Sequence, residues 1–351
     1  MRFAVVALLL GSACSPHTAA DPQADLAAYN ALAAQYNTRS QKAFGRTVFE
    51  YSAQQNQLYY LDFTNESPTL HRLDTNGTTL DYGFSVGDGE TYNFRASSQI
   101  IVTAQPSGAN AIYRAYDANA RNRLLGQVTL PVPSGTKWEA YAVDGDKIWM
   151  VSTDVGTTLM SWNPGSDPVA QMPMGVSGVF EDFGVSGDRM VYLESGRVWV
   201  MSVSSGQATW THNPLQADGT VVQWDDAGLL FSTDKALSYY DFARGQLVDI
   251  TAAINAKSYR VNDTFDNVSR YSSGGALWKS TVVYISTNGV FGYELGTDNL
   301  KPILLTPNLE VRTNYYRPTV LDNGTLYVTG TPSTLSGTNQ AAVYKVSLAG
   351  L

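Results

Sequence analysis

Val143-Asp-Gly-Asp-Lys-Ile-Trp-Met-Val-Ser-Thr-Asp154 and Val185-Ser-Gly-Asp-Arg-Met-Val-Tyr-Leu-Glu194 are two copies of one pattern, in which a Gly-Asp turn leads into an apolar strand. A second strand with aromatic residues follows each copy, as in Leu159-Met-Ser-Trp162 and Val198-Trp-Val-Met201. Turn residues between short β-branched and aromatic runs are typical of antiparallel hairpins. The pattern therefore predicts a repeated β-hairpin unit.

The same unit recurs from residue 47 onward. Its apolar strands start at Leu58, Ile100, Ile148, Met190, Leu229, Val282 and Leu326. Successive starts are separated by 39 residues (Met190 to Leu229) to 53 residues (Leu229 to Val282). A period of about 40–50 residues with four short strands is typical of a β-propeller blade, which must stack on its neighbours to bury both faces. We expect an all-β propeller of about seven four-stranded blades over residues 47–351, with six or eight blades as alternatives.

The last unit reaches only about three strands before Leu351. The missing outer strand could come from residues near 40–46, which would pair the two ends of the chain. Such closure hides sheet edges that would otherwise promote aggregation.

Met1-Arg-Phe-Ala-Val-Val-Ala-Leu-Leu-Leu-Gly-Ser-Ala-Cys-Ser-Pro16 has one positive residue, an apolar run and small residues before the single cysteine. These are features of a secretory signal, and the stretch resembles a bacterial lipoprotein signal. The resemblance implies a signal peptide over residues 1–13 and acylation, including palmitate, of Cys14. Because Ser15 follows, it also implies sorting to the outer membrane. Ordinary cleavage near Ala20 is the alternative, and it would release a soluble protein.

Residues 14–46 form a lipidated tether in this interpretation. Asp21-Pro22 can begin a helix, and residues 24–36 predict a short amphipathic helix with an apolar stripe. We expect this helix to pack against the main domain, with partner binding as the alternative.

The composition excludes several function classes. Hydrophobic residues make up 44% of the chain and charged residues 15%, which favours a folded chain over a disordered stalk. The net charge of −8 argues against binding nucleic acid or docking on anionic lipid. A single cysteine cannot form an internal disulfide.

One unit carries a closer resemblance. Gly196-Arg-Val-Trp-Val-Met-Ser-Val-Ser-Ser-Gly206-Gln-Ala-Thr-Trp210 is similar to the repeat of quinoprotein-dehydrogenase-like propellers, in which a Trp docks on the neighbouring blade. That repeat also occurs in a non-catalytic outer-membrane lipoprotein scaffold of β-barrel assembly. The resemblance implies a propeller and a scaffold role, and no quinone-binding set of residues can be matched.

Motifs for catalysis and metal binding are scarce. His17, His71 and His212 are isolated, and Asp74-Thr-Asn76-Gly77 lacks the distal Glu of a calcium loop. Ser152-Thr-Asp154-Val-Gly156 approximates a sialidase-type Asp box, which is a structural turn. Neither a nucleophile elbow nor a phosphate loop stands in a strand–turn–helix context. We expect no metal and no cofactor, and an enzymatic role is less favoured than a binding role.

The predicted first strand of each blade carries an aromatic residue beside a polar one. The polar members are Glu50, Asn93, Glu139, Glu181 and Gln223. First strands line the central channel of a propeller, and alternation along a strand directs either the polar or the aromatic members toward it. These polar groups either satisfy backbone groups and channel water or form a partly acidic pocket for a cation, a sugar or a basic peptide.

The largest insertion lies between the fifth and sixth units, within residues 252–271. Its Tyr259, Arg260 and Phe265 are residue types that often anchor interfaces. Packing over the adjacent blade explains them equally well.

These features favour a non-catalytic, membrane-anchored envelope lipoprotein that acts as a protein-binding propeller scaffold. An envelope protein is the expected partner. The alternative is a carbohydrate-binding or glycoside-cleaving propeller that uses carboxylates and aromatic residues at the channel mouth.

Overall fold

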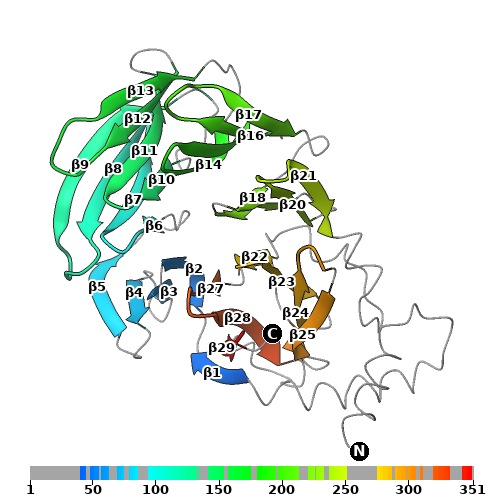
Figure 1. The fold of residues 1–351 in the computed structure, drawn as a ribbon. Coiled ribbons are helices and arrows are strands. Elements are labelled where there is room, and N and C mark those ends of the chain that lie inside the picture. Colours follow the sequence, from blue (N-terminus) through cyan, green and yellow to red (C-terminus); the bar gives the residue numbers. More distant parts are fainter. Residues whose placement is uncertain are drawn as a thin grey trace, which may run out of the picture. The chain divides into compact units, whose positions relative to one another are not determined.

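The computed structural model is an all-β propeller of seven blades (Figure 1). It describes residues 40–44, 48–54, 57–62, 69–74, 79–85, 94–132, 134, 141–153, 157–174, 180–194, 197–212, 220–225, 227–232, 237–250, 275–286, 289–297, 299–305, 309–310, 319–332 and 342–349. The chain divides into two compact units, one of residues 48–221 and one of residues 1–47 with 222–351.

Residues 48–221 form blades 1 to 4, each a sheet of four antiparallel strands in chain order. Blade 1 contains β2 (Val48–Gln54), β3 (Gln57–Asp62), β4 (Thr69–Asp74) and β5 (Thr79–Ser85). Blade 2 contains β6 (Phe94–Ala96), β7 (Ile100–Ser107), β8 (Asn110–Asp117) and β9 (Leu124–Pro131). Blade 3 contains β10 (Tyr141–Asp144), β11 (Lys147–Ser152), β12 (Thr158–Trp162) and β13 (Val169–Pro173). Blade 4 contains β14 (Phe180–Ser186), β15 (Arg189–Glu194), β16 (Arg197–Ser202) and β17 (Ala208–His212).

Blades 5 to 7 make up the other unit, except for the first two residues of β18. Blade 5 contains β18 (Thr220–Trp224), β19 (Gly228–Ser232), β20 (Leu237–Asp241) and β21 (Gln246–Asp249). Blade 6 contains β22 (Gly275–Trp278), β23 (Thr281–Ser286), β24 (Gly289–Glu294) and β25 (Asn299–Leu305). Blade 7 contains β27 (Thr319–Val320), β28 (Thr325–Pro332), β29 (Ala342–Ser347) and β1 (Ser40–Phe44), and β26 (Leu309–Glu310) pairs with the far end of β28.

The predicted repeat is confirmed strand by strand. Each of the seven apolar starts, from Leu58 to Leu326, lies in the second strand of its blade. The prediction of a closing strand is also confirmed, because β1 pairs antiparallel with β29 and Ser40 lies opposite Val346. Seven blades replace the alternatives of six or eight.

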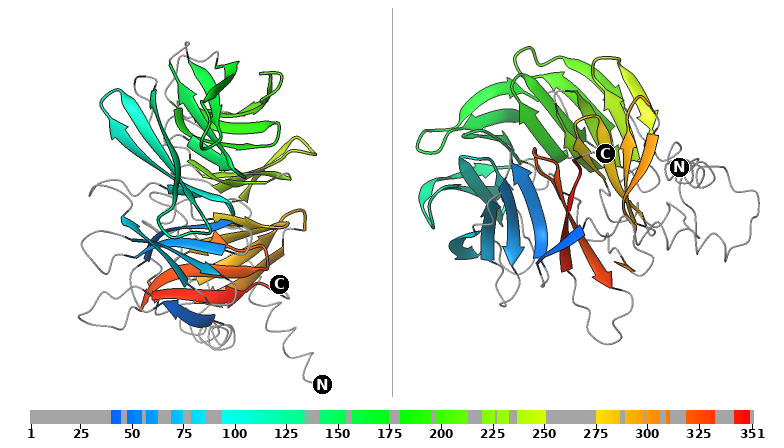
Figure 2. Two further views of the ribbon diagram at one scale, coloured as in Figure 1. Left: turned by 90° about the vertical axis from the view of Figure 1, so that its left-hand side faces the viewer. Right: turned by 60° about the horizontal axis from the view of Figure 1, so that its bottom comes forward.

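Consecutive blades of residues 48–221 pack through their first strands and through shared apolar clusters. β2 contacts β6, β6 contacts β10, and β10 contacts β14 (Figure 2). Between blades 2 and 3, the hydroxyl of Tyr141 donates to the carbonyl of Val102 (2.9 Å) inside a cluster that includes Tyr113 and Trp162. Each sheet thereby covers the apolar face of the next.

Several sequence predictions lie outside the described residues. They are the signal over residues 1–13, Cys14, the tether up to residue 39 with its helix, Asn93, Glu139, and the insertion with Tyr259, Arg260 and Phe265. In the described part of the chain, no helix has the length and apolar character needed to cross a membrane.

Candidate functional site

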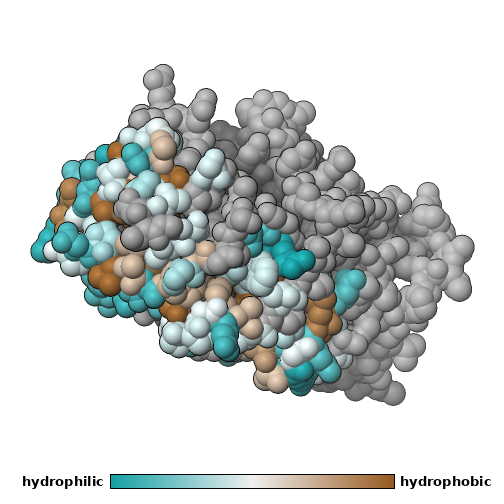
Figure 3. Space-filling view, turned by 90° about the horizontal axis from the view of Figure 1, so that it is seen from above, coloured by the Kyte–Doolittle hydropathy of each residue, from teal (hydrophilic) through white to brown (hydrophobic). Residues whose placement is uncertain are grey.

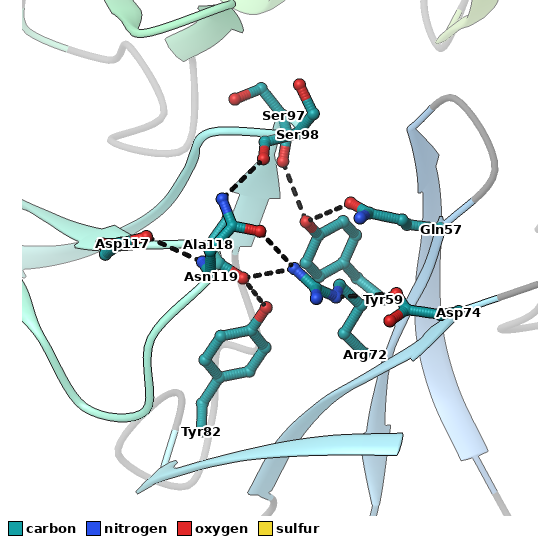
Figure 4. A network of polar contacts seen from close by, with 10 residues as sticks. All are labelled: Gln57, Tyr59, Arg72, Asp74, Tyr82, Ser97, Ser98, Asp117, Ala118 and Asn119. Atoms are coloured by element: carbon teal, nitrogen blue, oxygen red, sulfur yellow. Dashed lines mark hydrogen bonds and ion pairs between the residues drawn. The ribbon is translucent and has the colours of Figure 1, made fainter. Parts of the chain in front are cut away.

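A buried polar network joins blades 1 and 2 (Figure 4). Arg72, which is 9% exposed, donates through Nη1 to the carbonyl of Ala118 and to Oδ1 of Asn119 (3.0 Å). Its Nε pairs with Oδ1 of Asp74 at 3.0 Å. The hydroxyl of Tyr82 donates to the same Ala118 carbonyl (2.6 Å). One carbonyl of blade 2 therefore receives two donors from blade 1.

The electrostatics of this network suit a structural connection. Burial raises the pKa of Tyr82 and of Tyr59, so both phenols stay protonated and donate hydrogen bonds. The hydroxyl of Tyr59 lies 2.9 Å from the carbonyl oxygen of Ser97 in blade 2. Because these donors and the guanidinium of Arg72 all have partners, we assign the network to holding the two blades together.

Two of the predicted acidic positions share a backbone feature. In β2 the register shifts between Phe49 and Tyr51, which leaves Glu50 at a β-bulge. In β14 the register shifts between Phe180 and Asp182, which leaves Glu181 at a β-bulge. Bulges re-aim side chains and occur often beside functional sites. Glu50 lies four residues before Gln54, which closes the first hairpin of blade 1, and Glu181 lies five residues before Ser186, which closes that of blade 4. The two bulges are therefore offset by one residue along their strands.

Gln223 lies nearer to the hairpin turn of its blade than Glu50 and Glu181 do. It precedes by two residues Asp225, whose N–H donates to the carbonyl of Gly228 (3.0 Å) and closes the first hairpin of blade 5. Its side chain accepts from the N–H of Leu277 (2.8 Å) and donates to the carbonyl of Leu277 (3.3 Å) in β22. The amide of Gln223 is thus engaged with the backbone of blade 6.

Arg95 occupies the corresponding position of blade 2, two residues before Ser97, which closes that hairpin on Ile100. Its guanidinium lies 5.5 Å from the ring centroid of Tyr141 on the first strand of blade 3. Arg95 and Gln223 each lie two residues before the first hairpin turn of their blade, and each side chain contacts the following blade. Arg95 was not predicted from the sequence, because it follows the aromatic–polar motif rather than forming part of it.

His71 and Asp74 take part in packing and pairing inside blade 1. The ring of His71 stacks on Tyr60 with centroids 5.3 Å apart, and its Nε2 lies 2.9 Å from Oγ1 of Thr69. Asp74 pairs with Arg72. Among the described residues, no group of three or more His, Cys, Asp or Glu side chains is placed to hold a metal ion.

The interface of blades 3 and 4 differs from the other interfaces by its composition. Four of the seven methionines of the chain, Met172, Met174, Met190 and Met201, lie in its apolar cluster. The indole N–H groups of Trp149 and Trp199 are buried in this cluster without a hydrogen-bond acceptor among the described residues. Flexible methionines fill irregular spaces and are common at adaptable binding surfaces. We call this region the Met-rich interface.

Glu194 lies at the edge of the Met-rich interface and is only 8% exposed. By strand alternation it shares a sheet face with Tyr192, a member of the cluster. Arg197 lies directly opposite Glu194 in the β15–β16 pair. Its guanidinium instead lies 5.5 Å from the ring centroid of Trp199, which stacks on Tyr192 at 5.9 Å. Glu194 was not predicted as a site residue, although the second repeat copy ends on it.

Exposed apolar groups are sparse on the described surface. On the face shown in Figure 3, hydrophobic residues form small groups separated by hydrophilic ones. Three large hydrophobic side chains are exposed among the described residues, and each lies on an outer strand: Leu124 of β9, Val169 of β13 and Leu247 of β21. The described surface therefore does not present one broad apolar patch on that face.

Comparison with known proteins supports the fold. No protein-family model matches the chain, and no curated protein sequence matches it. A prolyl endopeptidase structure matches 92% of this chain and 50% of its own length, with a TM-score of 0.55 and 13% identity. The chain thus spans about half of that protein.

Two smaller structures are similar over nearly their full length. The WD40 β-propeller domain of Doa1 matches 87% of this chain and 94% of its own, with a TM-score of 0.50 and 13% identity. A chain of the mitotic checkpoint complex matches 88% of this chain and 91% of its own, with a TM-score of 0.52 and 11% identity. These likenesses define a seven-blade β-propeller, a fold that hosts many unrelated functions.

Proposed function

We propose that this protein is a membrane-anchored scaffold of the bacterial cell envelope that binds another protein through its propeller. The observation that carries the proposal is the match to the WD40 domain and to the checkpoint-complex chain over almost their whole lengths. Propellers of that kind offer rigid blades whose loops and inter-blade surfaces recognise partners.

The anchoring part of the proposal rests on residues 1–16. An apolar run of eight residues, Phe3 to Leu10, is too short to span a bilayer and precedes Cys14 at the distance of a lipoprotein signal. Acylation of Cys14 would tether the propeller to the outer membrane, since several acyl chains together give stable attachment.

The test combines fractionation with capture. Full-length tagged protein and its Cys14→Ser variant are labelled with palmitate, fractionated, and cross-linked in intact cells before mass spectrometry. We expect label and membrane location only with Cys14, and one dominant envelope protein cross-linked at higher yield to the anchored form. Equal labelling of both forms would contradict anchoring through Cys14, and the absence of any cross-linked protein would contradict the scaffold role.

A carbohydrate-binding role is the second candidate. It is favoured by Glu50 and Glu181, each of which occupies a bulge on the first strand of its blade. Glycan-array binding that is lost in both Glu50→Gln and Glu181→Gln would support this role. If the protein binds no glycan on the array, this role is excluded.

A further inference from the structure

We propose that the outer strand of blade 2, β9, binds an extended acidic segment of the protein partner, which adds to the sheet as a further strand. In such an addition, backbone hydrogen bonds provide the affinity and flanking side chains provide the specificity. The inference rests on the proposed scaffold function and names the surface and the chemistry of the partner.

The first support is that β9 lacks the features that usually protect an outer strand. Unpaired strand edges attract other chains, and proteins protect them with short strands, charged residues or proline. With eight residues, β9 is the longest outer strand of the described blades, and from Leu124 to Leu130 it contains no charged residue and no proline. The other outer strands carry such residues or are short: Asp81 in β5, Pro173 in β13, Asp249 in β21, Lys301 and Pro302 in β25, Lys42 in β1, and only five residues in β17. An edge left open over this length favours a binding role.

The second support is the direction of the backbone groups of β9. The N–H of Val132 donates to the carbonyl of Ala109 (3.1 Å), beyond the last pair of the β8–β9 register. Hydrogen-bonded and non-hydrogen-bonded pairs alternate along an antiparallel ladder. By this alternation, the backbone N–H and carbonyl groups of Gln127 and Thr129 point away from β8. They are therefore directed toward the open edge of the sheet.

Pro131 marks the end of this open edge. Its carbonyl points in the same direction and accepts from the N–H of Thr153 in blade 3 (3.2 Å). Among the described residues, no strand besides β8 pairs with β9, which lies at the outer rim of blade 2 (Figure 1). The side chains of Gln127 and Thr129 are exposed, and Leu124 is 51% exposed. The open edge thus begins at Leu124 and ends before Pro131.

The third support is the charge beside the start of β9. Arg121 and Arg123 lie just before the strand, with side chains 68% and 66% exposed. Arg121 pairs with Asp81 at 3.7 Å, and Arg123 pairs with Asp117 at 3.2 Å. Because exposed ion pairs of this kind contribute little, carboxylates of a ligand can compete for both guanidinium groups.

Arg114 adds a positive charge in the neighbouring strand β8. It lies opposite Gln127 and donates to the side-chain oxygen of that residue (2.8 Å). The three arginines outnumber the two aspartates that pair with them, although the whole chain has a net charge of −8. This local excess favours an acidic ligand. A second copy of β9 matches it less well, because β9 contains no acidic residue.

The direct test is the binding of a fluorescein-labelled, capped peptide, Glu-Glu-Thr-Val-Thr-Val-Thr-Glu-Glu, to the full-length protein in detergent, measured by fluorescence anisotropy. One matched peptide carries Lys in place of each Glu. A second carries N-methyl groups on the Thr and Val nitrogens, which removes their hydrogen-bond donors. We expect the Glu peptide to bind and both matched peptides to bind at least about tenfold more weakly.

Variants of the protein locate the site. Arg123→Ala should weaken binding of the Glu peptide about threefold or more, because it removes a cation beside the open edge. Arg244→Ala in blade 5 is the matched control, since Arg244 is also 66% exposed and pairs with Asp241 at 3.6 Å, and its affinity should stay within about 1.5-fold of wild type. Thr129→Pro removes an N–H that faces the open edge and should weaken binding about tenfold. If Thr129→Pro does not fold, the N-methylated peptide tests the same backbone hydrogen bonds.

Three results would overturn the inference: no binding of the Glu peptide, equal binding of the N-methylated peptide, or equal weakening by Arg123→Ala and Arg244→Ala. A dimer in light scattering that Thr129→Pro dissociates would assign the open edge to a second copy of the chain instead. An envelope protein that cross-links in cells equally to wild type and Thr129→Pro would leave the scaffold role intact while excluding this site.

Discussion

The guanidinium of Arg72 in β4 and the carbonyl of Ala118 after β8 are hydrogen-bonded across 46 residues of sequence. The hydroxyl of Tyr82 donates to the same carbonyl, so both lone pairs of this oxygen are used. These two hydrogen bonds connect blade 1 to the turn that follows the third strand of blade 2. This contact explains why a nearly buried Arg occurs in a strand with no catalytic motif.

Removing the contacts of Arg72 should destabilise the protein. In Arg72→Met, Asp74 loses its ion-pair partner and Asn119 loses a donor, and we expect a loss of about 2–4 kcal/mol in the free energy of unfolding. Urea denaturation measures it. Arg121→Met is the control, since Arg121 is 68% exposed and pairs with Asp81 only at 3.7 Å, and its loss should stay below about 0.5 kcal/mol. Equal urea midpoints for Arg72→Met and Arg121→Met would contradict a role of Arg72 in holding blades 1 and 2 together.

Buried tyrosines predict alkaline unfolding. Burial raises the pKa of Tyr59, Tyr82, Tyr113, Tyr192, Tyr239, Tyr240 and Tyr327. For Tyr239 the pKa is raised to about 12. The folded state then binds more protons than the unfolded chain above about pH 10, so stability falls as pH rises through that range.

The measurement is tyrosinate absorbance and circular dichroism during the same alkaline titration, with urea-unfolded protein as the reference. We expect the buried phenols to ionise together with unfolding, at higher pH than in the reference. Tyr239→Phe should make the loss of stability with pH less steep. Ionisation at the reference pH with the fold intact would contradict the burial of these side chains.

The side chain of Gln223 connects blades 5 and 6, and its removal should lower the free energy of unfolding. Gln223→Ala leaves the N–H of Leu277 without its acceptor and should cost about 1–3 kcal/mol. Gln223→Glu keeps an acceptor for that N–H but places a charged oxygen near the carbonyl of Leu277, and should cost at least as much. Thermal unfolding distinguishes this role from ligand binding, since a purely ligand-binding Gln223 would leave both variants as stable as wild type.

Two glycines separate backbone strain from packing. Gly108 has φ of +64° and open space where a methyl group would lie, whereas Gly324 has φ of +80° and a Cβ there would lie 2.6 Å from the ring of Trp278. Gly108→Ala should cost about 1–2 kcal/mol from the backbone alone. Gly324→Ala should cost about 1–3 kcal/mol more, because Trp278 must move. Equal losses in chemical denaturation would show that the contact with Trp278 is not tight.

The blade count and the closing strand were predictable from the sequence because both depend on local patterns. Turn residues before apolar runs place the second strand of every blade, and the shortage of one strand at the C-terminus indicates that β1 pairs with β29. Candidate sites were less predictable. Gln223 lies three residues nearer to the hairpin turn of its blade than Glu181 does, and from this position its side chain contacts Leu277.

Glu194 shows a different limit of the sequence. Its 8% exposure arises at the edge of a cluster that contains methionines from two blades, and Arg197 opposite it stacks on Trp199. Neither can be read from the order of residues in β15. By contrast, the acidic residues at positions 50 and 181 were found by their aromatic neighbours, and the structure adds that both occupy bulges.

The most direct test of the scaffold role is the composition of the native complex extracted from envelopes in mild detergent. Size-exclusion chromatography with light scattering gives the mass of the tagged full-length protein as isolated, and mass spectrometry identifies what accompanies it. A scaffold role predicts one other envelope protein at a constant ratio. Recovery of the propeller chain alone, or with polysaccharide in place of protein, would contradict it.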